Sequence, residues 1–171
     1  MNALLISPKE SYESLWLDLI QEYNSLNETF VPNAITGEKS DYREYLNYLQ
    51  EAGTRQDQNH VPSSTYFLMT DKEDRIYGVI TIRHFLTEKL KLFGGHVGYG
   101  IRPSERGNGL GKKVLLLGLE KCMDLKINSV RVTCDKSNVR SARVIINAGG
   151  KLVQEYNNGT EIVQVYDIFI N

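Results

Sequence analysis

Residues 106–112, which read Arg-Gly-Asn-Gly-Leu-Gly-Lys, constrain the fold more than any other part of the sequence. Glycines occupy the alternate positions Gly107, Gly109 and Gly111, and residues without a Cβ let a backbone turn tightly and approach a ligand closely. The segment lies between a strand-like stretch and an amphipathic helix, whose first N–H groups have no partner within the helix. Those groups and the positive end of the helix dipole favour an anion. The sequence therefore predicts a phosphate-binding turn that joins a strand to a helix.

Hydrophobic periodicity predicts helices and strands on both sides of this turn. Apolar residues at helical spacing predict a helix that begins at Pro8, with Ser7 as its cap, and a second helix over residues 41–53. Residues 53–64 carry no apolar period and are expected to form a loop. One helix should follow the glycines, and another should span residues 138–148. Strands are expected over residues 4–6, 66–69, 76–82, 96–102 and 129–134, followed by two strands that join near residues 157–159.

This order of elements indicates an α/β or α+β fold with a mixed sheet. Of the 171 residues, 41% are apolar and 24% are charged, which is enough for a stable core without disulfides or metal. No internal repeat and no shift in composition marks a second domain. We therefore expect a single domain over residues 1–171.

Charge and composition argue against several classes of partner. The formal net charge is -1 and the isoelectric point is near 6.3, so nothing attracts the chain generally to nucleic acid or to an anionic membrane. No targeting signal is recognisable, and no segment reaches the roughly 20 apolar residues that span a bilayer. Cys122 and Cys134 lack metal-ligand spacing and are expected to be small buried apolar residues. A cytoplasmic protein with no metal site, no nucleic-acid partner and no membrane partner is expected.

Two common phosphate-binding patterns do not fit the glycine run. A Walker A loop needs Gly, four residues and then Gly-Lys-Ser/Thr, but Arg106 takes the first glycine position and Lys113 takes the hydroxyl position. The dinucleotide fingerprint needs Gly-x-Gly-x-x-Gly in an opening βαβ unit, whereas the glycines here alternate and begin only at Gly107. A nucleotide triphosphatase and a dinucleotide-binding oxidoreductase are therefore not favoured.

The pattern that fits is Arg-x-x-Gly-x-Gly, formed by Arg106, Gly109 and Gly111. Here the chain resembles the acyl-coenzyme A binding motif of the GCN5-related N-acetyltransferase (GNAT) superfamily. A second match follows, in which Asn138 and Ser141 resemble the family's Asn-x-x-Ser/Ala helix, and this helix ends in Gly-Gly at residues 149–150. The two motifs place an acyl-CoA-binding core over residues 65–156. Residues 1–60 correspond to the variable N-terminal helical region on the acceptor side.

The resemblance implies a GNAT-like single domain with a central mixed, mostly antiparallel sheet, a splayed strand pair and flanking helices. It implies acetyl-CoA as cosubstrate and direct transfer of the acetyl group to a primary amine, with no metal and no covalent enzyme intermediate. The acceptor is a small-molecule amine or a peptide or protein amine, and the sequence does not identify it. Homodimer formation stays open. The alternative is a catalytically weak acyl-CoA-binding regulatory or sensor module.

The resemblance also implies which residues hold the cofactor. The backbone of residues 99–101 should pair with the pantetheine arm, a strand amide near Ile101 should polarise the thioester carbonyl, and the amides of the glycine turn should hold the pyrophosphate. Arg106 and Lys112 either add charge near the phosphates or are ordinary surface cations. The implied cofactor-binding residues are Tyr99, Gly100, Ile101, Arg106, Gly107, Asn108, Gly109, Leu110, Gly111, Lys112, Asn138 and Ser141.

Two proton transfers need catalytic groups or water. An amine with a pKa of about 10.4 must lose a proton before it attacks, and His96 begins the strand where relatives often carry a glutamate base. His84 is a weaker candidate for the same role. Relatives often protonate the departing thiolate with a tyrosine, but that position is Ile145 here. We expect Ser141 or solvent to take this role, with Tyr166 as a weaker alternative.

Overall fold

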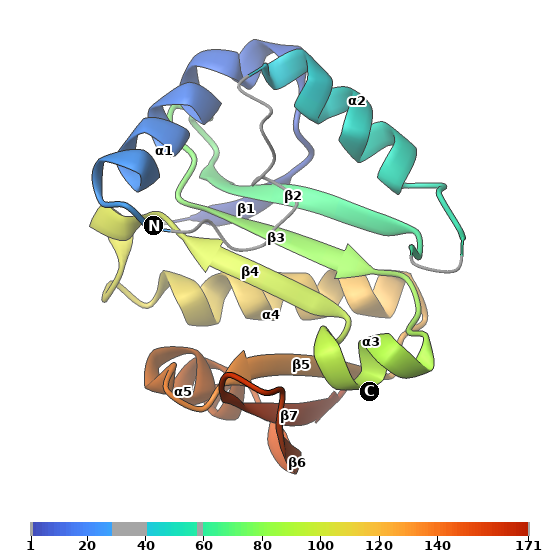
Figure 1. Ribbon diagram of the computed structural model, residues 1–171. Coiled ribbons are helices and arrows are strands. Elements are labelled where there is room, and N and C mark those ends of the chain that lie inside the picture. Colours follow the sequence, from blue (N-terminus) through green and yellow to red (C-terminus); the bar gives the residue numbers. More distant parts are fainter. Residues whose placement is uncertain (1, 29–40, 58–59, 171) are drawn as a thin grey trace.

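The described residues, 2–28, 41–57 and 60–170, form one seven-stranded sheet in this computed structural model. Helices cover both of its faces (Figure 1). The strand order is β1-β2-β3-β4-β5-β7-β6, and every neighbouring pair is antiparallel except β4 and β5, which are parallel. The expected mixed, mostly antiparallel sheet is confirmed. The strands are β1 (Ala3–Ile6), β2 (Ser63–Thr70), β3 (Gly78–Arg83), β4 (Val97–Ile101), β5 (Ser129–Asp135), β6 (Lys151–Asn157) and β7 (Ile162–Phe169).

Most helices begin where the sequence predicts. The carboxylate of Asp41 accepts hydrogen bonds from the amides of Arg43 and Glu44 and so caps the second helix, and Asn138 caps the fifth. The helices are α1 (Glu13–Ser25), α2 (Tyr42–Ala52), α3 (Glu88–Phe93), α4 (Leu110–Asp124) and α5 (Val139–Asn147), with 3₁₀ turns at Glu10–Tyr12 and Pro103–Glu105. The short α3 was not predicted, because six residues are too few to show a helical period, although Thr87 caps it.

The prediction that the first helix begins at Pro8 is wrong. Lys9 is extended, a 3₁₀ turn follows it, and α1 begins only at Glu13. The carbonyl of Lys9 accepts hydrogen bonds from the amide of Tyr12 and from the hydroxyl of Tyr42 on α2. These contacts keep Lys9 outside the helix, so tertiary packing overrides the local capping signal.

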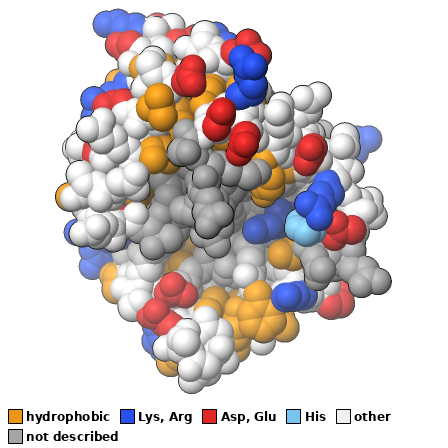
Figure 2. Space-filling model, turned by 45° about the horizontal axis from the view of Figure 1, so that its top comes forward, with side chains coloured by type: hydrophobic (Ala, Val, Ile, Leu, Met, Phe, Trp, Pro, Cys, Tyr) orange, Lys and Arg blue, Asp and Glu red, His pale blue; other side chains and the backbone are white. Residues whose placement is uncertain are grey.

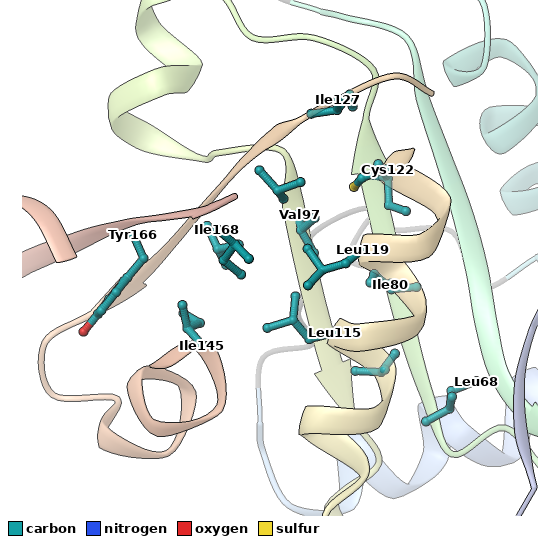
Figure 3. Close-up of a cluster of buried hydrophobic side chains, with 14 of the residues drawn as sticks. Leu68, Ile80, Val97, Leu115, Leu119, Cys122, Ile127, Ile145, Tyr166 and Ile168 are labelled. Carbon is teal, nitrogen blue, oxygen red and sulfur yellow. The ribbon is translucent and has the colours of Figure 1, made fainter. Parts of the chain in front are cut away.

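The sheet has a core on each face, because successive residues of a strand point to opposite sides. On β2, Phe67 and Met69 pack toward α1 and α2, whereas Leu68 packs toward α4. Figure 3 shows the core on the α4 side of the sheet, called the second core below. In it, Leu115 and Leu119 of α4 face side chains of the sheet. No helix in the described part of the chain has the length and apolarity needed to cross a bilayer.

Candidate active site

Strands β4 and β5 diverge, and this opening is the centre of the candidate site. Their register contains one pair, Val97 with Val132. On its other side β4 pairs with β3 along its whole length, up to Ile101. The backbone N–H and C=O groups of successive residues point alternately to the two sides of a strand, so those of Tyr99 and Ile101 point toward the opening. The carbonyl of Ile101 already accepts a hydrogen bond from the hydroxyl of Tyr23 at 2.7 Å. The groups left toward the opening are the N–H and C=O of Tyr99 and the N–H of Ile101.

The glycine turn lies beside this opening and leads into α4. Gly107 and Gly109 have φ angles of 86° and 79°, in the left-handed region that favours glycine, and Gly109 is the N-cap of α4. A Cβ at either position would meet no heavy atom within 4 Å, and residues 107–109 are exposed. Gly111 differs, because its Cβ would lie 3.1 Å from a methyl group of Val144 on α5. Two glycines therefore shape an exposed turn, and the third lets α4 and α5 pack closely.

The two cations of the motif have different surroundings. The guanidinium of Arg106 lies 2.6 Å from the carboxylate of Glu28, and its Nε donates to the carbonyl of Ile101 at 3.2 Å. The hydrogen bond to Glu28, and after it an interaction with Tyr23, raise the pKa of Arg106. Lys112 is exposed, and no ion pair joins it to another described residue. Arg106 therefore ties the turn to the end of α1, while Lys112 stays available to an anion.

Asn138 and Ser141 lie on the other side of the opening, at the start of α5. The side-chain oxygen of Asn138 accepts a hydrogen bond from the amide of Ser141 at 3.0 Å, so it caps the helix. The hydroxyl of Ser141 lies 3.2 Å from the hydroxyl of Tyr99 on β4, and the thiol of Cys134 is their neighbour. Burial raises the pKa of Tyr99 to about 12. The hydroxyl groups of Tyr99 on β4 and Ser141 on α5 thus meet beside the opening between β4 and β5.

The side chain of Tyr99 was missed by sequence reasoning, which used only its backbone. The signal that could have found it is the alternation of β4. Val97, Tyr99 and Ile101 all pack on the face that carries α4 and α5, where Ser141 lies.

The position that carries a tyrosine in many relatives holds a core residue in this chain. Ile145 is fully buried and packs among side chains of the second core (Figure 3). The hydroxyl of Tyr166, the weaker alternative, donates to the side chain of Gln164 at 2.8 Å. Tyr99 and Ser141 are consequently the described hydroxyl pair that faces the opening.

His96 lies at the opposite end of β4 and is not brought together with Ser141 or the glycine turn. Its Nδ1 accepts a hydrogen bond from the amide of Arg131 at 2.9 Å, and its ring borders a hollow that Asp167 also lines. Burial, together with the Arg131 cation, lowers the pKa of His96 to about 4. The ring is therefore neutral at pH 7 with its hydrogen on Nε2. His84 borders the same hollow, and its Nε2 lies 2.8 Å from the hydroxyl of Ser64.

A buried arginine fixes α1 to the end of β4. Arg102 is 1% exposed, and its guanidinium lies 2.5 Å from the carboxylate of Asp18 and 3.2 Å from that of Glu22, both on α1. Glu22 also accepts the amide of Ser104 at 2.7 Å. Sequence reasoning missed Arg102, although a charged residue at the end of an apolar strand could have signalled a buried ion pair.

Comparison with known proteins gives a family match and a set of shared folds. The family model described as acetyltransferase (GNAT) domain matches residues 13–151. No curated protein matches the chain significantly.

Three solved structures illustrate the shared fold. The ribosomal-protein-S5-alanine acetyltransferase of Vibrio fischeri is 12% identical with a TM-score of 0.73, and the match covers 99% of this chain and 93% of that one. The ribosomal L7/L12 α-N-protein acetyltransferase RimL, in complex with coenzyme A, is 17% identical with a TM-score of 0.70, over 99% and 95% of the chains. The microcin C7 self-immunity acetyltransferase MccE, in complex with acetyl-CoA and AMP, is 14% identical with a TM-score of 0.70, over 99% and 93%.

Proposed function

The chain belongs to the acetyltransferase (GNAT) domain family, and from this premise we propose that it transfers an acetyl group from acetyl-CoA directly to a primary amine. The observation that carries the proposal is the opening between β4 and β5 beside an exposed glycine turn that caps α4. An exposed turn supplies amides for a pyrophosphate, and an unpaired strand edge supplies hydrogen-bonding groups for an amide-containing arm. Both needs of a coenzyme A molecule are met at one place.

The residues present fit coenzyme A group by group. The amides of residues 107–112 and the ammonium group of Lys112 would hold the pyrophosphate at the start of α4. The N–H and C=O of Tyr99 would pair with the pantetheine arm as a neighbouring strand does. The amide of Ile101 would polarise the thioester carbonyl. The thioester makes the acetyl carbon electrophilic, and the protein contributes orientation and proton transfer.

We propose that Tyr99, together with Ser141, supplies the proton that the departing sulfur takes up. The hydroxyls are 3.2 Å apart across the opening, and a phenol whose pKa is near 12 keeps its proton at neutral pH. When the bond from the acetyl carbon to sulfur breaks, Tyr99 donates its proton to the thiolate and Ser141 relays a replacement proton from solvent. This assignment supplies the acid that Ile145 cannot be.

The attacking amine must lose its proton on the other side of the acetyl carbon. His96 was expected to accept it, but its Nδ1 already accepts the amide of Arg131 and its Nε2 carries the hydrogen. We therefore propose that water takes the proton of the amine and that His96 is a positioning residue, which holds the start of β4 against β5.

A screen of amines with acetyl-CoA tests the proposed function. Release of free thiol that depends on an added primary amine, with equal formation of the N-acetyl product, supports direct transfer. Cofactor binding without thiol release across a broad amine panel would instead support the sensor alternative, which an isoleucine at position 145 permits. Protection of the fold by NAD(P) but not by acetyl-CoA in a thermal-shift comparison would overturn both.

A further inference from the structure

A pocket of about 230 Å³ opens on the face of the sheet that carries α1 and α2. Its walls come from α2, the segment after α2, β2, β3, α3 and β4. Figure 2 shows this side of the molecule, where Lys and Arg side chains lie beside a histidine and among Asp and Glu side chains. Gly98 of β4 lines the pocket, directly before the Tyr99 backbone to which we assign the pantetheine arm. The pocket therefore reaches the strand that would hold the thioester.

The charged groups around this pocket are unequally paired. Arg55 lies 2.9 Å from the carboxylate of Asp57, and the ring of His60 lies 2.8 Å from the same carboxylate. Glu51 also lines the pocket. Arg83 differs from Arg55, because no described carboxylate lies within ion-pair distance of its guanidinium.

The protein holds the guanidinium of Arg83 in a fixed place. One terminal nitrogen donates to the carbonyls of Gly94 and Gly95, at 3.3 Å and 3.0 Å. Its Nε and its other terminal nitrogen have no hydrogen-bond acceptor among the described residues. The side chain is half-buried, and burial lowers the pKa of Arg83. A partly desolvated cation with an unused pair of donors matches the two oxygens of a carboxylate.

The register of the sheet sets the backbone separation between Arg83 and Gly98. Thr81 of β3 faces Gly98 of β4, and Arg83 lies two residues further along β3. Two strand residues span about 7 Å. Arg83 and Gly98 line the same pocket, so a ligand whose carboxylate meets Arg83 would extend through the pocket toward β4.

We propose that this pocket binds the acceptor and that Arg83 recognises a carboxylate on it, so that the substrate class is a small amino carboxylate. The inference deepens the proposed acetyl transfer and rests on it. A simple alkylamine or a diamine lacks the group that Arg83 binds, so these amines are poor acceptors.

Amine pairs that differ only by the carboxylate test this assignment. We would compare lysine with cadaverine and γ-aminobutyrate with n-butylamine, and measure kcat/KM in the wild type and in Arg83→Met, Arg83→Lys and Arg55→Met. The wild type should prefer the amino carboxylate by about 10- to 100-fold, the range of a charged hydrogen bond. Arg83→Met should remove this preference, so that the two members of each pair have similar kcat/KM values. Arg83→Lys should keep part of the preference.

Arg55→Met is the control for nonspecific charge, since it removes a cation that Asp57 already neutralises. It should keep most of the preference. Equal rates for both members of each pair, or equal losses for both in Arg83→Met, would overturn the carboxylate assignment and leave acetyl transfer intact.

A binding measurement separates this inference from the proposed function. γ-Aminobutyrate would be titrated calorimetrically into the protein saturated with coenzyme A, which carries no acetyl group. Binding that Arg83→Met weakens by about 10-fold or more supports the site even if no amine releases thiol. The absence of any Arg83-dependent binding or selectivity would overturn it.

Discussion

At the scale of single residues, the chain combines the glycine turn with an isoleucine at the position where many relatives carry a tyrosine. Ile145 is a fully buried core residue, so the hydroxyl usual at its position is lost. Tyr99 reaches the same opening from β4 and meets Ser141 of α5 at 3.2 Å. The acid can therefore come from the strand when the helix does not provide it.

Replacing Tyr99 with phenylalanine tests this role. Tyr99→Phe keeps the ring and removes the proton, so we expect kcat at neutral pH to fall by about 10- to 100-fold while the Kd for acetyl-CoA stays nearly the same. Tyr166→Phe is the matched control, because its hydroxyl is bonded to Gln164. Equal effects of the two substitutions on kcat would remove Tyr99 from the mechanism.

His96 should make the stability of the protein depend on pH. Its pKa is about 4 in the folded protein and near 6.5 when unfolded, so the fold favours the neutral ring. The contribution is complete above pH 6.5 and is lost as the pH falls from 6.5 to 4. His96→Asn retains an acceptor for the amide of Arg131 and cannot titrate. Between pH 6.5 and pH 4, the free energy of unfolding of the wild type should fall by on the order of 1 kcal/mol more than that of this variant, after allowance for screening of a half-exposed ring.

Urea denaturation at a series of pH values measures this difference. Carboxylates contribute equally to both proteins, so the difference between the two curves isolates His96. Parallel curves from pH 7 to pH 4 would show that the ring is not held neutral.

At the scale of elements, α1 is fixed to the end of β4 by the ion pairs of the buried Arg102. Arg102 bonds Asp18 and Glu22, and Tyr23 of the same helix donates to the carbonyl of Ile101. The helix that covers the acceptor face is therefore joined to the strand that would hold the cofactor.

Arg102→Met should lower the free energy of unfolding by about 1–3 kcal/mol, because it removes the ion pairs of the buried guanidinium with Asp18 and Glu22. Arg106→Met is the matched control. The side chains of its ion pair with Glu28 are 33% and 38% exposed, so solvent screens the pair and the loss should stay below about 1 kcal/mol. Urea denaturation measures both, and equal losses would contradict the anchoring role of Arg102.

Local chemistry explains which elements the sequence could predict. The glycine turn and the Asn138 cap depend on neighbours within a few residues, so their patterns are visible in the chain. The start of α1 depends on a contact between Lys9 and Tyr42, which lie far apart in sequence. The capping signal at Ser7 therefore predicts the wrong first residue for this helix. The short α3 lacks a period altogether.

At the scale of the whole molecule, β4 contributes to both faces of the sheet that we propose to bind ligands. Tyr99 points toward α5, where the Tyr99–Ser141 pair lies, and Gly98 lines the pocket on the α2 side. The sequence predicts the cofactor side from one contiguous turn. It does not predict the pocket at Arg83, because α2, β2, β3 and β4 each contribute only one or a few residues to it.

The binding of acetyl-CoA at the glycine turn is the central claim, and one pair of variants tests it most directly. Gly109→Val and Gly159→Val both place a branched side chain at a positive φ with no atom nearby, so both carry the same backbone strain of about 1–2 kcal/mol. Only Gly109 caps α4; Gly159 lies in the turn between β6 and β7.

Calorimetric titration with acetyl-CoA would measure the Kd of both variants and of the wild type. Gly109→Val should raise the Kd by at least about 100-fold, because its side chain stands where the pyrophosphate must approach the amides. Gly159→Val should bind acetyl-CoA as the wild type does. An unchanged Kd in Gly109→Val, or the same loss in both variants, would contradict the assignment of the cofactor site.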